Sequence, residues 1–173
     1  MNNKLIINNI LRFILLLALQ VLVLNNVYLG VEVSPVVYIM FILMLPTNCN
    51  KFLLLALSFL SGLCVDIFSN TLGFHAFAAT LIGFLRILVA NRILTQNEKD
   101  IDSPSIRSVS IKQFSIYTLI LTSIYCFAYL MLEAFDFRDI FSVIFLTIIN
   151  TIITYVLIFV LQVLFIRKRD VID

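Results

Sequence analysis

The chain has 173 residues, of which 62% are hydrophobic and only 13% are charged, and its formal net charge is +2. A soluble globular domain is roughly half apolar and about a quarter charged, so this composition excludes an ordinary water-soluble fold. The sequence predicts an all-α polytopic membrane protein that forms a single domain.

Six apolar runs separated by short polar breaks occupy nearly all of the chain. Five of them are long enough to cross about 30 Å of hydrocarbon at about 1.5 Å per residue. The second is the exception, because only ten residues lie between Pro35 and Pro46, and length alone also allows a re-entrant segment. In chain order we expect spans over 5–24, 33–45, 52–69, 74–91, 113–133 and 140–166.

The positive charges decide the number of crossings. Cytoplasmic loops of membrane proteins are enriched in Lys and Arg. If the second run crosses, with 31–34 added to its length, Arg138 alone lies outside and nine other basic residues share the side of the N-terminus. These are Lys4, Lys51, Arg92, Lys99, Arg107, Lys112, Arg167, Lys168 and Arg169. We therefore expect a six-helix bundle with both termini in the cytoplasm.

The first run carries Lys4 and Arg12 but no small-x-small cleavage site, so we expect it to remain as an anchor. Cys49, Cys64 and Cys126 are widely spaced and form no CxxC pair, which indicates small buried side chains. We expect no metal and no cofactor.

Three ionisable residues inside spans stand out, because a charged side chain that faces lipid there costs about 2.5 kcal/mol or more. They are Asp66, His75 and Arg86. Asp66 and Gly62 share a small, polar helical face with Ser58 and Ser69, which favours close approach of the next helix. A short turn brings Asp66 and His75 together at the outer end of the bundle.

For Asp66 we favour a structural bridge, made through His75 or through backbone amides, over a proton relay or a ligand contact. A packing role is also the simpler interpretation of His75. Arg86 lies near the cytoplasmic end, so its side chain is expected to snorkel toward the headgroups. Hydroxyl and amide side chains form polar stripes on the last two runs, and we expect them to join helices, although a substrate cavity remains an alternative. These residues are Thr118, Thr122, Tyr125, Tyr129, Thr147, Asn150, Thr151 and Thr154.

Catalytic signatures are missing from the sequence: it contains no HExxH, GxSxG or GxxxxGK[ST] pattern and no pair of intramembrane aspartates. Asp66 and His75 alone provide neither a nucleophile nor an oxyanion site. We therefore expect a protein that is not an enzyme.

The segment 61–78 resembles a family signature. Gly62-Leu63-x-x-Asp66, followed by Gly73-x-His75, is similar to the motif of the rod shape-determining protein MreD family. The six runs, the long final run and the basic tail are similar as well.

The resemblance implies a non-enzymatic subunit of the bacterial elongation machinery in the cytoplasmic (inner) membrane. It implies binding to the single-span protein MreC, and an indirect link between MreB filaments and the glycan polymerase and transpeptidase of peptidoglycan synthesis. Lipid is the other expected partner, and no nucleic acid is expected. Gly62, Asp66, Gly73 and His75 carry the motif, while Arg86 is a further polar candidate.

The resemblance also implies a fold like the substrate-binding S-components of energy-coupling-factor vitamin transporters. A transporter subunit of that class is therefore the competing function. Against it, the first run has only Ala18 where such subunits carry an Ala-x-x-x-Ala pair for docking on their energising partner.

Overall fold

The computed structural model describes residues 3–26, 33–94, 104–106, 108–135 and 140–170. These residues form helices joined by turns and extended segments. The elements are α1 (Asn3–Leu22), η1 (Leu24–Asn26), α2 (Ile39–Leu43), α3 (Lys51–Ser69), α4 (Phe74–Ile93), α5 (Ile111–Ala134) and α6 (Ile140–Asp170).

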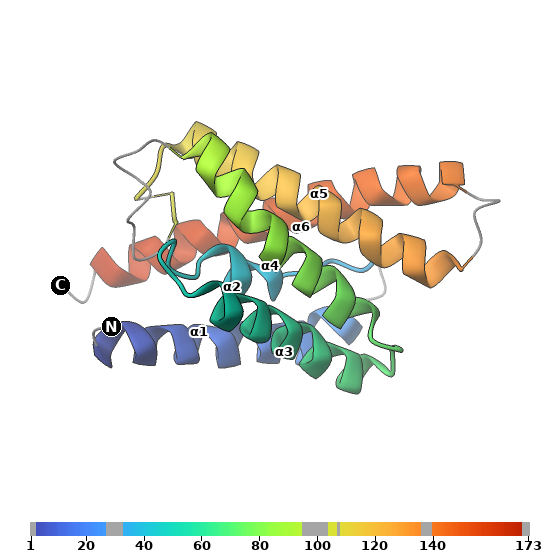
Figure 1. Ribbon diagram of the computed structural model, residues 1–173, viewed down its shortest axis with the longest axis horizontal. Helices are drawn as coiled ribbons and strands as arrows, with labels where there is room; N and C mark the ends of the chain where they lie inside the picture. The colour runs from blue at the N-terminus through green and yellow to red at the C-terminus, as the bar shows by residue number, and fades with distance from the viewer. Residues whose placement is uncertain (1–2, 27–32, 95–103, 107, 136–139, 171–173) are drawn as a thin grey trace.

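Five helical segments are long and apolar enough to cross a membrane, which indicates a multi-pass membrane protein. They correspond to the first, third, fourth, fifth and sixth expected runs. α3 packs along α4, α4 along α5, and α5 along α6, while α1 lies against α3. α1 begins and α6 ends at the same end of the bundle (Figure 1), which we call the terminal end.

The second expected span, which is the short one, contains only a short helix and not a helix of membrane-spanning length. Only Ile39–Leu43 are helical, and residues 33–37 have no regular secondary structure. A five-residue helix rises only about 7.5 Å. Pro35 has no N–H to donate, and Pro46 disfavours helical geometry in the residue before it, so the run is limited at both sides.

The segment 33–45 nevertheless passes along the inside of the bundle, and Val36 to Leu45 are each at most 5% exposed. Its backbone bonds to side chains of α6 in parallel register. The N–H of Ser34 donates to Asn150 Oδ1 at 2.9 Å, and the N–H of Val36 donates to Thr154 Oγ1 at 3.1 Å. Further along, Gln162 Nε2 contacts the sulfur of Met44 at 2.7 Å.

The same segment runs antiparallel to α1. Gln20 Oε1 accepts the N–H of Val37 at 2.8 Å, and Gln20 Nε2 donates to the carbonyl oxygen of Pro35 at 3.1 Å. Arg12 donates to the carbonyl oxygen of Met44 at 3.4 Å. The chain therefore advances from one end of the bundle toward the other with only the short helix α2 on the way, as the cyan trace in Figure 1 shows.

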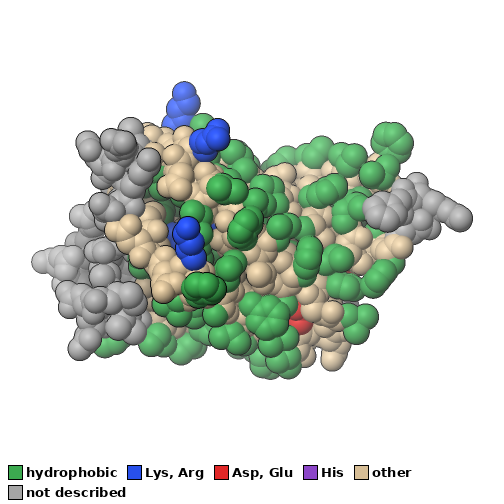
Figure 2. All heavy atoms as spheres, in the orientation of Figure 1, with side chains coloured by type: hydrophobic (Ala, Val, Ile, Leu, Met, Phe, Trp, Pro, Cys, Tyr) green, Lys and Arg blue, Asp and Glu red, His purple; other side chains and the backbone are tan. Residues whose placement is uncertain are grey.

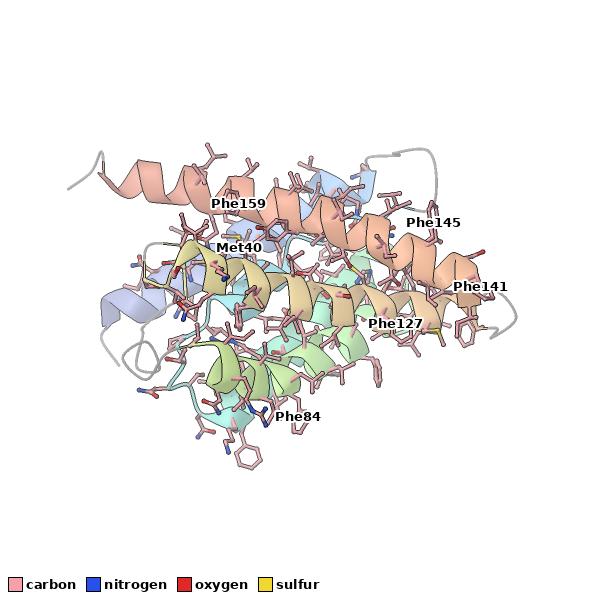
Figure 3. The ribbon with its side chains drawn as sticks, turned by 90° about the horizontal axis from the view of Figure 1, so that it is seen from above. Met40, Phe84, Phe127, Phe141, Phe145 and Phe159 are labelled. Atoms are coloured by element: carbon pink, nitrogen blue, oxygen red, sulfur yellow. The ribbon has the colours of Figure 1, made fainter. Side chains whose placement is uncertain are left out.

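The outer faces of the long helices are apolar. Phe141 is 85% exposed and Phe84 57% exposed, and Figure 3 shows both pointing away from the bundle, with Met40 inside it. Water would oppose so many exposed aromatic rings, whereas hydrocarbon accepts them without cost. The surface therefore suits a lipid environment.

Described basic side chains gather toward the terminal end. Lys51 begins α3, Arg92 lies near the end of α4, Lys112 lies at the start of α5, and all three are exposed. Figure 2 shows the Lys and Arg side chains of the visible face toward this end. This arrangement agrees with the charge asymmetry on which the expected orientation rests.

We predict that reporter fusions after Lys51, Asp102 and Asp173 will be cytoplasmic, and that fusions after Val31 and Asp136 will be external. The physical reason is the concentration of Lys and Arg at one end. Paired alkaline phosphatase and green fluorescent protein fusions measure the side of each position. An external signal at Asp102 would contradict the predicted number of crossings.

The buried segment yields a second prediction. Thr154→Val keeps the shape of the side chain but leaves the N–H of Val36 without an acceptor, so the free energy of unfolding should fall by about 1–3 kcal/mol. Thr122→Val is the matched control, because the buried hydroxyl of Thr122 has no hydrogen-bond partner and its removal should cost little. Unfolding by SDS in mixed micelles measures both, and equal losses would contradict the assignment.

Candidate functional site

Asp66 caps the N-terminus of α4. Its side chain is 3% exposed, Oδ1 accepts the backbone N–H of His75 at 3.1 Å, and Oδ2 accepts that of Ala76 at 2.8 Å. The hydroxyl of Thr71 also donates to Oδ1. The first N–H groups of a helix have no partner within it, and a carboxylate there is stabilised by the helix dipole. Both oxygens of Asp66 are therefore engaged in holding α3 to α4.

The turn between the two helices depends on backbone geometry that few residues adopt. Asn70 ends α3 with a φ of 55°, and Gly73 precedes α4 with a φ of 90°. Glycine occupies positive φ without steric cost. The motif glycine Gly73 thus turns the chain so that Asp66 faces the start of α4.

Gly62 lets the two helices touch. A Cβ atom on Gly62 would lie 2.6 Å from the Cα of Ala76, closer than real Cβ contacts come. About two helical turns further along α4, a Cβ on Gly83 would lie 2.9 Å from the Cβ of Ser58. The small, polar face predicted for this helix is present, and Ser58, Gly62 and Asp66 are all buried in it. Close backbone approach is the usual role of such small residues in membrane bundles.

The ring of His75 bonds to α5 rather than to Asp66. Its Nδ1 shares a hydrogen bond with the hydroxyl of Tyr125, and its ring stacks on Tyr129 with centroids 4.4 Å apart. Tyr125 in turn bonds to Tyr38 at 2.9 Å, and the hydroxyl of Tyr38 donates to the carbonyl oxygen of His75 at 3.4 Å. Of the two expected bridges, the structure contains the one through backbone amides.

We call Tyr38, Tyr125 and Tyr129, together with His75, the tyrosine cluster. Its hydrogen bonds determine which atom carries each proton. Each hydroxyl has a single proton, so when Tyr38 donates to the carbonyl of His75, Tyr125 donates to Tyr38. His75 then donates to Tyr125 from Nδ1, which leaves Nε2 without a proton in the neutral ring. The cluster ties α4, α5 and the segment 33–45 together at the end opposite the terminal end.

Arg86 does not snorkel, and the expectation that it would is wrong. Its side chain is 3% exposed; Nε donates to the hydroxyl of Tyr117 at 2.9 Å, and Nη2 donates to the carbonyl oxygen of Leu45. Tyr117 itself donates to the carbonyl oxygen of Leu43 at 3.1 Å. Carbonyl groups at the end of α2 have no donor within the helix. Arg86 points inward because it donates a hydrogen bond there.

Arg86 also lines a pocket of about 270 Å³ at the terminal end, which we call the Arg86 pocket. Its residues are Thr47, Asn48, Leu54, Arg86, Ile87, Ala90, Asn91 and Leu94. The positive charge of Arg86 acts on Cys49 in the neighbouring loop. Burial raises the pKa of the Cys49 thiol, and the positive charge of Arg86 lowers that pKa in part.

Sequence reasoning missed three residues that organise the interior: Gln20, Tyr38 and Tyr117. Gln20 was detectable as one of three amides in the first apolar run, with Asn8 and Asn9. Nothing in the sequence distinguishes Tyr38 and Tyr117 from aromatic residues that merely fill space. Thr118 and Thr122, expected to join helices, are buried with hydroxyls that have no partner.

The three cysteines are free, with Cys126 buried and Cys49 and Cys64 half-buried. Within the part of the chain that the structure describes, no group of three or more His, Cys, Asp or Glu residues is placed to hold a metal ion. No family model, curated protein or solved structure matches the chain.

We predict that His75 couples energetically to Tyr125 more strongly than to Asp66. His75→Phe and Tyr125→Phe each break the same hydrogen bond, so their losses should differ from additivity by about 0.5–3 kcal/mol. Asp66→Ala should cost about 1–3 kcal/mol by itself. Because Asp66 bonds to the backbone of His75, its loss and that of His75→Phe should add within about 0.5 kcal/mol.

Double-mutant cycles on unfolding in mixed micelles measure these couplings. The Asp66–Tyr125 pair is the control, since the two side chains act on different elements. A larger coupling for Asp66 and His75 than for His75 and Tyr125 would show that the ring, not the backbone, is the partner of Asp66.

Proposed function

We propose that this protein is a non-enzymatic membrane adaptor of the bacterial cell-elongation complex, similar to the MreD family, which binds MreC and helps to maintain cell shape. One observation carries the proposal. The four residues of the family-like motif lie in one hairpin, where three of them join α3 to α4 and the fourth joins the hairpin to α5. Gly62 allows contact, Asp66 caps α4, Gly73 makes the turn, and His75 bonds onward to α5.

The chemistry of the hairpin favours an adaptor over an enzyme. A general acid or base needs an oxygen or nitrogen within reach of a substrate. Both oxygens of Asp66 accept N–H groups of α4, and the ring of His75 is 5% exposed and stacked on Tyr129. Such groups are suited to holding helices in place.

The apolar outer surface supports partner binding within the membrane. Between helices in lipid, apolar burial gives little advantage over lipid contact, so association depends on close packing and a few hydrogen bonds. The span of MreC is the proposed direct partner. MreB filaments, the glycan polymerase and the transpeptidase of peptidoglycan synthesis are connected through it, and the location is the bacterial inner membrane with both termini in the cytoplasm.

We predict that depletion of this protein makes rod-shaped cells widen and round up, because the link between filaments and wall synthesis is lost. Cell width measured by microscopy is the readout, and a plasmid copy of the wild-type gene should restore it. MreC should co-purify with the tagged protein in mild detergent but not with an unrelated multi-span protein of similar size. Unchanged cell shape together with no recovered MreC would contradict the proposal.

The second candidate is a substrate-binding subunit of a vitamin or small-molecule transporter with an S-component-like fold. The Arg86 pocket favours it, since its volume of about 270 Å³ is close to that of small-ligand sites. Radiolabelled vitamin uptake in the depleted strain distinguishes the two functions. An uptake defect with normal cell width would assign the protein to transport.

A further inference from the structure

We propose that the Arg86 pocket binds the phosphate group of a phospholipid, with Arg86 as the residue that bonds to the phosphate oxygens. The inference does not rest on the adaptor function. The pocket lies between the start of α3, the last turns of α4 and the loop at residues 47–48. It therefore lies toward the terminal end of the bundle, the end at which the exposed basic residues Lys51 and Arg92 lie.

Two hydrogen bonds fix the side chain of Arg86 and leave N–H groups that can bind an anion. A guanidinium has five N–H donors in a planar fork and keeps its charge in proteins. Tyr117 and the carbonyl of Leu45 take one donor each and fix the direction of the side chain. Three of the five N–H groups remain for another acceptor, and a guanidinium can donate two parallel hydrogen bonds to two oxygens of a phosphate.

The charge of Arg86 lacks a counter-charge among the described side chains. The acidic residues whose side chains the structure describes are Asp66 and Glu133. They lie near the ends of α3 and α5, at the end of the bundle opposite Arg86. A buried charge that no described side chain neutralises is costly, and an anion that enters the pocket offsets that cost.

The rest of the pocket matches a lipid better than a free ion. Leu54, Ile87, Ala90 and Leu94 give it apolar walls, which a free phosphate leaves unused and an acyl-glycerol covers. The exposed Lys51 and Arg92 lie at the same end and attract anionic headgroups. A volume of about 270 Å³ is just below that of sites for drug-sized ligands, so it holds a headgroup and not the whole lipid.

The test uses the full chain, stripped of lipid in a non-ionic detergent. The probes are dioleoylphosphatidylglycerol, dioleoylglycerol, which has the same chains and no phosphate, and inorganic phosphate. Native mass spectrometry and the midpoint temperature of unfolding measure binding. The wild-type protein should bind the phospholipid much more tightly than either other probe.

Arg86→Gln should weaken phospholipid binding about ten- to a hundredfold, the size of a charge-assisted hydrogen bond. Since Arg86 also bonds to Leu45 and Tyr117, a second variant keeps the test decisive if this one does not fold. Ala90→Leu keeps Arg86 and fills the pocket beside it, so it should abolish binding. Ala56→Leu, on the exposed face of α3, is the matched control and should bind as the wild type does.

Equal binding of dioleoylphosphatidylglycerol and dioleoylglycerol by the wild-type protein would overturn the proposal. So would wild-type affinity in Ala90→Leu, since the lipid would then sit elsewhere. Inorganic phosphate that binds as tightly as the phospholipid would assign the pocket to a free phosphate compound and overturn the lipid source.

Discussion

The interior of this bundle is organised by the need to pair the backbone of the segment 33–45. Inside a membrane no water reaches an N–H or C=O group, so non-helical backbone survives only where protein groups satisfy it. Polar side chains from four of the long helices do this. They are Arg12 and Gln20 of α1, Arg86 of α4, Tyr117 of α5, and Asn150 and Thr154 of α6.

The hairpin of α3 and α4 is the second organising element. It too depends on pairing backbone groups in a region where water provides no donors or acceptors. The start of α4 has N–H groups without helical partners, and the carboxylate of Asp66 takes two of them. Gly62 brings the helices close enough for that reach. His75 then connects the hairpin to Tyr125 and Tyr38, so the segment 33–45 is bonded at both of its ends: by the tyrosine cluster and by Arg86.

Much of the fold was predictable, because five apolar runs of membrane-spanning length have one structural solution in lipid. The stripe of Ser58, Gly62 and Asp66 was also predictable, since its spacing places the three residues on one helical face. The partners of these residues were not. Asp66 was expected to bond either to His75 or to backbone amides, and only the close approach of the two helices decided for the amides.

Composition and the charge pattern by themselves determined the class of protein, its long helices and the grouping of basic residues at one end. Tertiary structure alone decided the conformation of the second apolar run and the inward orientation of the Arg86 side chain. A short run between two prolines has too few hydrogen bonds of its own to be helical throughout, and its conformation depends on Gln20, Asn150 and Thr154, residues distant in sequence. Arg86 turns inward for the same reason. Its guanidinium donates to the carbonyl oxygen of Leu45, and no local sequence pattern indicates this pairing.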